Sequence, residues 1–194
     1  MKLNSSINYI VSGLERSGTS LLMQIIYNGG FPVCSDKLRK PDNNNPKGYF
    51  ELEGGKIINK LMDFSFPFEK YQGSFIKITA YGLKFLPKGN YKIIYSERNI
   101  EEILCSMEKM AQIKDENRAE TKQIFLKLNT MIKNIIQERD DCQVLFINYN
   151  EMIKQPKQEI NKILLFIGEK QADKQAMIQT IDTDLYRQRN SIIS

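Results

Sequence analysis

The sequence predicts an α/β fold of three layers, in which helices flank both faces of a mostly parallel central sheet. Two observations support this prediction. Short apolar runs that are typical of strands alternate with longer segments whose apolar residues recur at helical spacing. In addition, a glycine-containing loop joins the first predicted strand to the first predicted helix, as in the βα units of parallel sheets. The length of 194 residues predicts one domain, residues 1–194.

The elements follow one another in this alternation. The first strand is predicted at Ile7–Val11, and the next helix places Leu21, Leu22, Ile25 and Ile26 on one side. A connection over residues 29–48 is rich in Asn, Pro, Asp and Lys, and loops of this length in compact domains are usually functional. Further strands are predicted over 74–79, 91–95 and 144–147, and helices over 54–62, 99–113, 116–139 and up to Gly168. The helix over 116–139 carries an apolar stripe of Ile124, Leu128, Met131, Ile132 and Ile135.

The composition restricts the classes of partner and site. The net charge of +5 suits an anionic ligand, but basic residues are interleaved with acidic ones, so we expect no nucleic-acid partner. Three scattered cysteines and no histidine predict neither a disulfide framework nor a metal site. No apolar stretch approaches the ~20 residues that cross a bilayer, and Met1 to Val11 lacks a signal-peptide core. We therefore expect a reduced, cytoplasmic protein without membrane contact.

The octapeptide Gly13–Ser20 has the spacing of a phosphate-binding loop. The nucleoside-triphosphatase pattern is G-x-x-x-x-G-K-[ST], in which the lysine contacts the β/γ-phosphates. Here Thr19 occupies the lysine position, and the nearest cation is Arg16. A helix N-terminus after such a loop offers backbone N–H groups to an anion. The loop thus predicts a three-layer P-loop fold that binds a phosphate-like anion without hydrolysing ATP; the alternative is an ordinary turn of glycine and serine.

A second constellation combines an arginine with a hydroxyl. The segment over residues 91–98, which contains the strand over 91–95, ends in Arg98, and Ser106 follows eight residues later on the next helix. An arginine fork and a serine donor in this arrangement can converge on one phosphate. In the alternative reading, Arg98 pairs with Glu101 or Glu102 and Ser106 faces a neighbouring helix.

Together these motifs resemble the sulfotransferase family. Arg16-Ser17-Gly18-Thr19-Ser20 fits the family loop [KR]-[ST]-G-T-[ST], which holds the 5′-phosphosulfate of 3′-phosphoadenosine 5′-phosphosulfate (PAPS). The resemblance implies that Arg98 and Ser106 bind the 3′-phosphate of this donor. Asn99 stands where the family usually has aspartate. Weaker similarities to bacterial sulfotransferase-like proteins lie at 42–51, 145–152 and 185–189, so the likeness runs from about residue 10 to residue 189.

The resemblance also implies catalytic roles. Arg16 takes the place of the lysine that meets the charge on the leaving oxygen in many relatives. A general base is required, and Glu51 best matches the carboxylate that some relatives place after the first helix. Glu53 and Asp42 are weaker candidates, and Glu51 could instead cap the helix that begins near Gly54.

Four further cations are candidate ligands. Arg39 and Lys47 lie in the connection over 29–48 and could contact an anionic acceptor or the donor. Arg187 and Arg189 could reach the 3′-phosphate in place of the basic C-terminal loop of many relatives, which has no clear counterpart here.

The resulting hypothesis is a sulfotransferase that moves a sulfuryl group from PAPS, without a metal, to a hydroxyl or amine of an unidentified small molecule or glycan. Two alternatives stay open. One is a P-loop small-molecule kinase, and the other is a nucleotide-binding relative that does not catalyse transfer.

Overall fold

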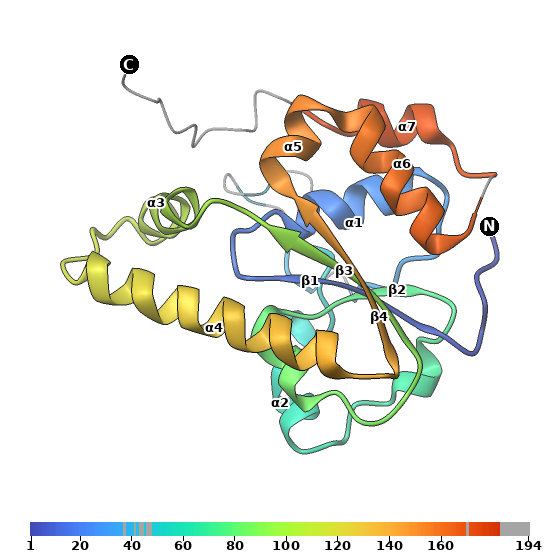
Figure 1. Cartoon of the computed structure of the whole chain (residues 1–194), viewed down its shortest axis with the longest axis horizontal. Coiled ribbons are helices and arrows are strands. Elements are labelled where there is room, and N and C mark those ends of the chain that lie inside the picture. The colour runs from blue at the N-terminus through green and yellow to red at the C-terminus, as the bar shows by residue number, and fades with distance from the viewer. Residues whose placement is uncertain (37, 41, 43–44, 46–47, 170, 183–194) are drawn as a thin grey trace.

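A parallel four-stranded sheet forms the centre of the molecule (Figure 1). The computed structural model describes residues 1–36, 38–40, 42, 45, 48–169 and 171–182. The strands are β1 (Asn8–Gly13), β2 (Phe75–Lys77), β3 (Tyr91–Glu97) and β4 (Cys142–Asn148), in the spatial order β2-β1-β3-β4. All three pairings are parallel, which confirms the predicted sheet.

Helices cover both faces of the sheet, so the three-layer α/β prediction is confirmed (Figure 1). One face packs against α1 (Thr19–Asn28), α6 (Pro156–Ile167) and α7 (Lys174–Gln179), with Val11 and Ile94 in that core. The other face packs against α2 (Ile57–Met62) and α4 (Arg118–Glu138), with Ile10 and Ile93 in the second core. Because neighbouring strand residues point to opposite faces, both cores require the continuous apolar runs of β1 and β3.

The boundaries of two elements differ from the prediction for local reasons. The helix predicted over 54–62 begins only at Ile57, because Gly54 (φ 60°) and Gly55 (φ 87°) adopt left-handed backbone in a preceding 3₁₀ turn, Glu53–Gly55. The strand predicted over 74–79 is limited to the three residues of β2. Four short elements were not predicted from the sequence: α5 (Tyr149–Lys154), α7 and the 3₁₀ segments Phe68–Lys70 and Ala80–Phe85.

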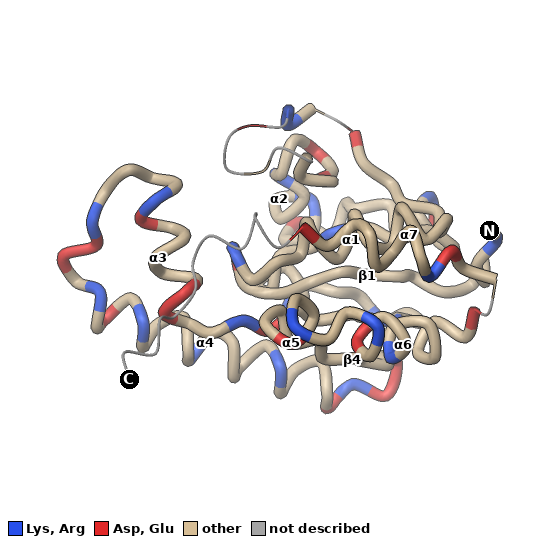
Figure 2. Tube along the Cα trace, turned by 90° about the horizontal axis from the view of Figure 1, so that it is seen from above, with Lys and Arg blue, Asp and Glu red and all other residues tan. Residues whose placement is uncertain are grey.

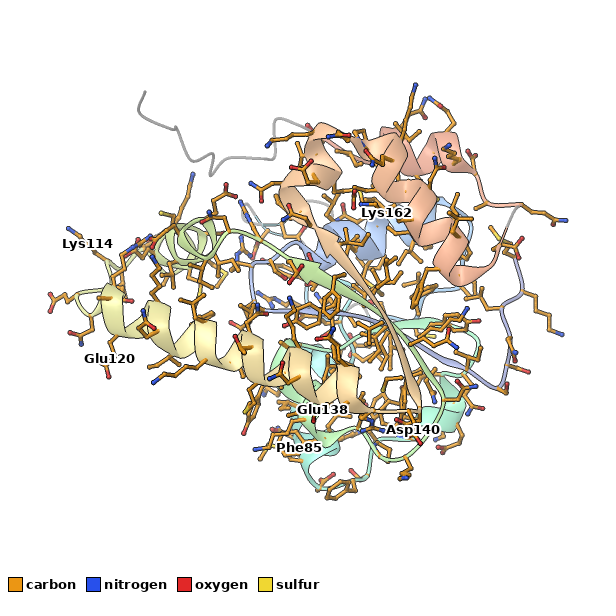
Figure 3. All side chains as sticks on the ribbon, viewed as in Figure 1. Phe85, Lys114, Glu120, Glu138, Asp140 and Lys162 are labelled. Carbon is orange, nitrogen blue, oxygen red and sulfur yellow. The ribbon has the colours of Figure 1, made fainter. Side chains whose placement is uncertain are left out.

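The helix pair α3 (Ile100–Ala111) and α4 extends beyond the sheet. Figure 3 places Lys114 and Glu120 at the outer tip of this pair and Glu138 at its sheet end. Only the sheet half of α4 is deeply buried, at Ile132 and Ile136. The predicted stripe is therefore wrong in part, because Ile124 and Met131 are exposed by 55% and 39%. In the described part of the chain, no helix has both the length and the apolar content needed to cross a membrane.

Candidate functional site

The glycine loop lies between the end of β1 and the start of α1. Gly18 occupies the N-cap of α1 with a φ of 107°, and no side chain caps this helix end. The first N–H groups of a helix have no partner within it, so they are available to a ligand here. Gly18 is required sterically, because a Cβ at this position would lie 2.3 Å from Cδ2 of Tyr149. The loop thus presents backbone donors above a tyrosine ring.

Arg16 connects this loop to α3. Its Nε donates to the hydroxyl of Ser106 over 3.0 Å, although the two residues are far apart in sequence. Its own backbone has a φ of 64°, which is uncommon outside glycine and often marks functional loops. The Arg98 guanidinium donates to the Arg16 carbonyl over 3.1 Å. The two predicted phosphate-binding motifs therefore meet at one place.

Arg98 is held by a buried polar network. Its Nε lies 2.9 Å from a carboxylate oxygen of Glu102, and the two side chains are only 8% and 2% exposed. The other oxygen of Glu102 accepts from the Asn150 amide over 2.9 Å. Arg98 also lies 4.4 Å from the centre of the Tyr149 ring. Burial raises the pKa of the Tyr149 hydroxyl, against the lowering effect of Arg98, so this hydroxyl stays neutral. Arg98 thus pairs with Glu102, as the alternative interpretation expected, and also contacts the glycine loop through the Arg16 carbonyl, while its binding of a phosphate stays a prediction.

A buried lysine closes the other end of the loop. Lys77, the last residue of β2, is 7% exposed, and its Nζ lies 3.3 Å from the Ser20 hydroxyl and 3.1 Å from a carboxylate oxygen of Glu51. It also donates to the Tyr49 carbonyl. Burial lowers the pKa of Lys77, and the negative charge of Glu51 opposes this shift. A cation is therefore fixed beside the first turn of α1.

Glu51 lies between two cations. Besides Lys77, the Arg39 guanidinium reaches both of its carboxylate oxygens at 3.2 Å. Arg39 also stacks over the Tyr49 ring at 3.5 Å. The Tyr49 hydroxyl in turn donates to Asp42 at 2.8 Å. Glu51 is not the N-cap of α2, because Lys56 occupies that position and no side-chain hydrogen bond caps the helix there.

These groups surround a single cleft of about 300 Å³ at the carboxyl ends of β1, β2 and β3. Among the predicted site residues, those in the cleft lining are Arg16, Gly18, Thr19, Ser20, Glu51, Arg98 and Ser106. Arg39, a further candidate, also lines the cleft, whereas the Ser17 side chain is buried under the loop and is absent from this lining. Any role of Ser17 in anion binding stays a prediction.

Lys47, Arg187 and Arg189 fall outside the described residues, so their roles also stay predictions. Glu53 pairs with Lys60 over 2.8 Å, away from the cleft. Within the described ranges, no group of three or more cysteine and carboxylate side chains is placed to hold a metal ion.

Sequence reasoning missed Lys77, Lys109 and Tyr149, which all line the cleft. One signal for Lys77 was available, since a lysine near the end of an apolar strand is unusual in a parallel sheet and marks the ligand-binding edge. Tyr149 could have been suspected because it directly follows a predicted strand.

Comparison with known proteins gives a consistent result. The model of the sulfotransferase domain matches residues 7–190. A sulfotransferase domain from the Synechococcus PCC 7002 olefin synthase is structurally similar, with a TM-score of 0.58, 14% identity and coverage of 95% of this chain and 80% of that one. A mouse sulfotransferase complexed with PAP gives a TM-score of 0.54, 16% identity and coverage of 97% and 68%.

A retinol dehydratase in complex with androsterone and the inactive cofactor PAP gives a TM-score of 0.50 at 14% identity. There the coverage is 95% of this chain but only 66% of the other, so this chain spans slightly under two thirds of that relative. No curated protein matches the sequence.

Proposed function

Because this chain belongs to the sulfotransferase domain family, we propose that it transfers a sulfuryl group from PAPS to a hydroxyl or amine of a small molecule or glycan. One observation carries the proposal. The lysine-free glycine loop, Arg98 and Ser106 come together around one cleft through the contacts of Arg16. The glycine loop on one side, and Arg98 with Ser106 on the other, suit a donor with two separate anionic groups.

The residues present fit this donor. The uncapped N-terminus of α1, with Thr19 and Ser20, offers donors to a 5′-phosphosulfate. Arg98 and Ser106 would hold the 3′-phosphate. The solved relatives support this assignment, because two of them were crystallised with PAP, the desulfated form of the donor.

Two cations are placed to stabilise charge during transfer. PAPS supplies the sulfuryl group, whose bond to the bridging phosphate oxygen breaks as the bond to the acceptor forms. Arg16 lines the cleft from within the glycine loop, and Lys77 lies against Ser20 at the first turn of α1. Fixed donors aimed at developing charge usually make the largest contribution to catalysis. Arginine stays protonated and therefore acts here only as a stabilising cation.

The acceptor must lose a proton as it attacks. We propose that Glu51 accepts it, because Glu51 lines the cleft next to Lys77 and its side chain is 16% exposed. The ion pairs with Lys77 and Arg39 fix the position of this carboxylate beside the cleft.

The lining of the cleft favours a hydrophilic acceptor. Among the described residues, its aliphatic side chains are only Leu14, Leu21 and Met110, whereas Arg39, Lys77 and Glu51 bring charge to one end. An apolar acceptor would bury little surface against such groups and would have to desolvate them. The hydroxyl groups of a polyhydroxylated compound can replace the hydrogen bonds that these charged groups make with water.

The kinase alternative is disfavoured by the position of Glu97. A P-loop kinase needs an acidic residue after a strand to hold Mg²⁺. Glu97 ends β3, but it pairs with Lys133 on α4 and is absent from the cleft lining.

Isothermal titration with PAP, run beside Mg-ATP, tests the proposed function. PAP is expected to bind with a dissociation constant of about 1 μM or lower, which corresponds to a binding free energy of about −8 kcal/mol or more favourable. Mg-ATP is expected to bind at least about tenfold more weakly. Glu97→Gln serves as a control that leaves PAP binding unchanged. A preference for Mg-ATP that disappears in Glu97→Gln would instead support the kinase. PAP binding without any turnover of PAPS would support the non-catalytic relative.

Replacing Glu51 with glutamine tests the proton acceptor. Transfer is expected to fall about 100-fold, since general-base catalysis typically contributes at least this much, while PAP affinity changes little. The matched control is Glu53→Gln, which removes a nearby carboxylate outside the cleft. The transfer rate of both variants is measured as the steady-state release of PAP from PAPS. Equal effects of the two substitutions would exclude Glu51 as the base.

A further inference from the structure

The proposed 3′-phosphate end of the cleft carries little uncompensated positive charge. A phosphate monoester carries about −1.5 to −2 charges at neutral pH. Arg98 is already neutralised by Glu102, which is almost fully buried and lies 2.9 Å away. Ser106 is uncharged, so Arg16 is the only uncompensated cation among the three residues that meet there. A tight phosphate site would need a further cation.

Lys109 is placed to supply it. It lies on α3 three residues after Ser106, a spacing that puts both side chains on the same face of a helix. Both residues line the cleft. Lys109 is exposed and forms no ion pair with any other described residue. We propose that Lys109 binds the 3′-phosphate of the donor together with Arg98 and Ser106, an inference that rests on the proposed function.

The acidic neighbours of Lys109 on α3 do not compete for it. Glu108 pairs with Arg118 over 2.6 Å, and Glu101 pairs with both Arg118 and Lys122 of α4. Figure 2 shows how acidic and basic residues alternate along α3 and the start of α4. Because α4 neutralises these carboxylates, Lys109 keeps its charge available on the cleft side. Lys109 also occupies the last turn of α3, where the helix dipole favours a cation.

The test compares two nucleotides that differ only in the 3′-phosphate, PAP and adenosine 5′-monophosphate (AMP). In Lys109→Met, PAP affinity is expected to fall roughly tenfold, as for one charge-assisted contact, whereas AMP affinity, measured by displacement, changes less than about twofold. Lys109→Arg is expected to recover most of the loss. The matched control is Lys114→Met, which removes one positive charge at the outer tip of the α3–α4 pair, away from the cleft (Figure 3).

The outcomes separate this proposal from the proposed function. Equal weakening of PAP and AMP, no weakening of either, or an equal effect of Lys114→Met would each overturn the role of Lys109 while leaving the donor site intact. Failure of the unmodified protein to bind PAP would overturn the proposed function, and the role of Lys109 with it.

Discussion

Replacing Arg98 with alanine is expected to lower the free energy of unfolding by about 3–5 kcal/mol, the usual cost of leaving one member of a buried ion pair without its partner. The partner is Glu102, which is 2% exposed and would keep only its hydrogen bond from Asn150 among the contacts described above. PAP affinity is expected to fall at the same time, because Arg98 faces the cleft. Urea unfolding and isothermal titration measure the two effects separately.

The double variant Arg98→Met/Glu102→Gln separates folding from binding. It removes both charges and leaves side chains of similar size, so we expect most of the lost stability to return. PAP affinity should stay reduced by at least about tenfold, because a charge-assisted contact with phosphate is still missing. PAP binding at the level of the unmodified protein in this double variant would exclude Arg98 from the donor site.

Replacing Arg16 with alanine is expected to slow transfer by about 10²–10³-fold, the typical effect of removing one donor that faces developing charge. The fold should persist, because the Arg16 side chain is partly exposed and, among the described residues, donates a hydrogen bond only to Ser106. Release of PAP from PAPS, assayed with polyhydroxylated acceptors, measures the rate, and circular dichroism checks the fold.

Lysine at position 16 provides the matched control. Arg16→Lys keeps the charge but loses the fork of donors, so we expect it to retain much more activity than Arg16→Ala. Retention of full turnover by Arg16→Ala would contradict the mechanism, and Lys77 would then be the cation to replace next.

The sequence predicted that the glycine loop, Arg98 and Ser106, which form one half of the site, would lie together, and it could do so because its signals there are local. The glycine loop needs a strand before it and a helix after it, and both are strongly apolar. Arg98 and Ser106 lie on β3 and α3, which also follow from apolar periodicity. Asn99, the departure from the family pattern, still accepts a hydrogen bond from the Glu101 N–H as the N-cap of α3. The geometry of this half therefore agrees with the sequence interpretation.

The other half depends on contacts between distant segments, which no local pattern contains. Lys77 joins the site only because β2 pairs with β1, which places Lys77 beside Val11. Its contacts with Glu51 and the Tyr49 carbonyl then depend on the path of the preceding connection. α5 and α7 were missed because each has only six residues, too few for a clear helical period.

The length of β2 has a consequence for how this protein can diversify. The proposed donor half of the cleft rests on β1 and β3, the two inner strands, which pair over six residue positions. The acceptor half rests on a three-residue strand at the edge of the sheet and on the segment that carries Glu51. Insertions or substitutions on that side would disturb few backbone hydrogen bonds of the sheet. New acceptor preferences could therefore evolve on one side of the cleft while the nucleotide-binding side remains unchanged.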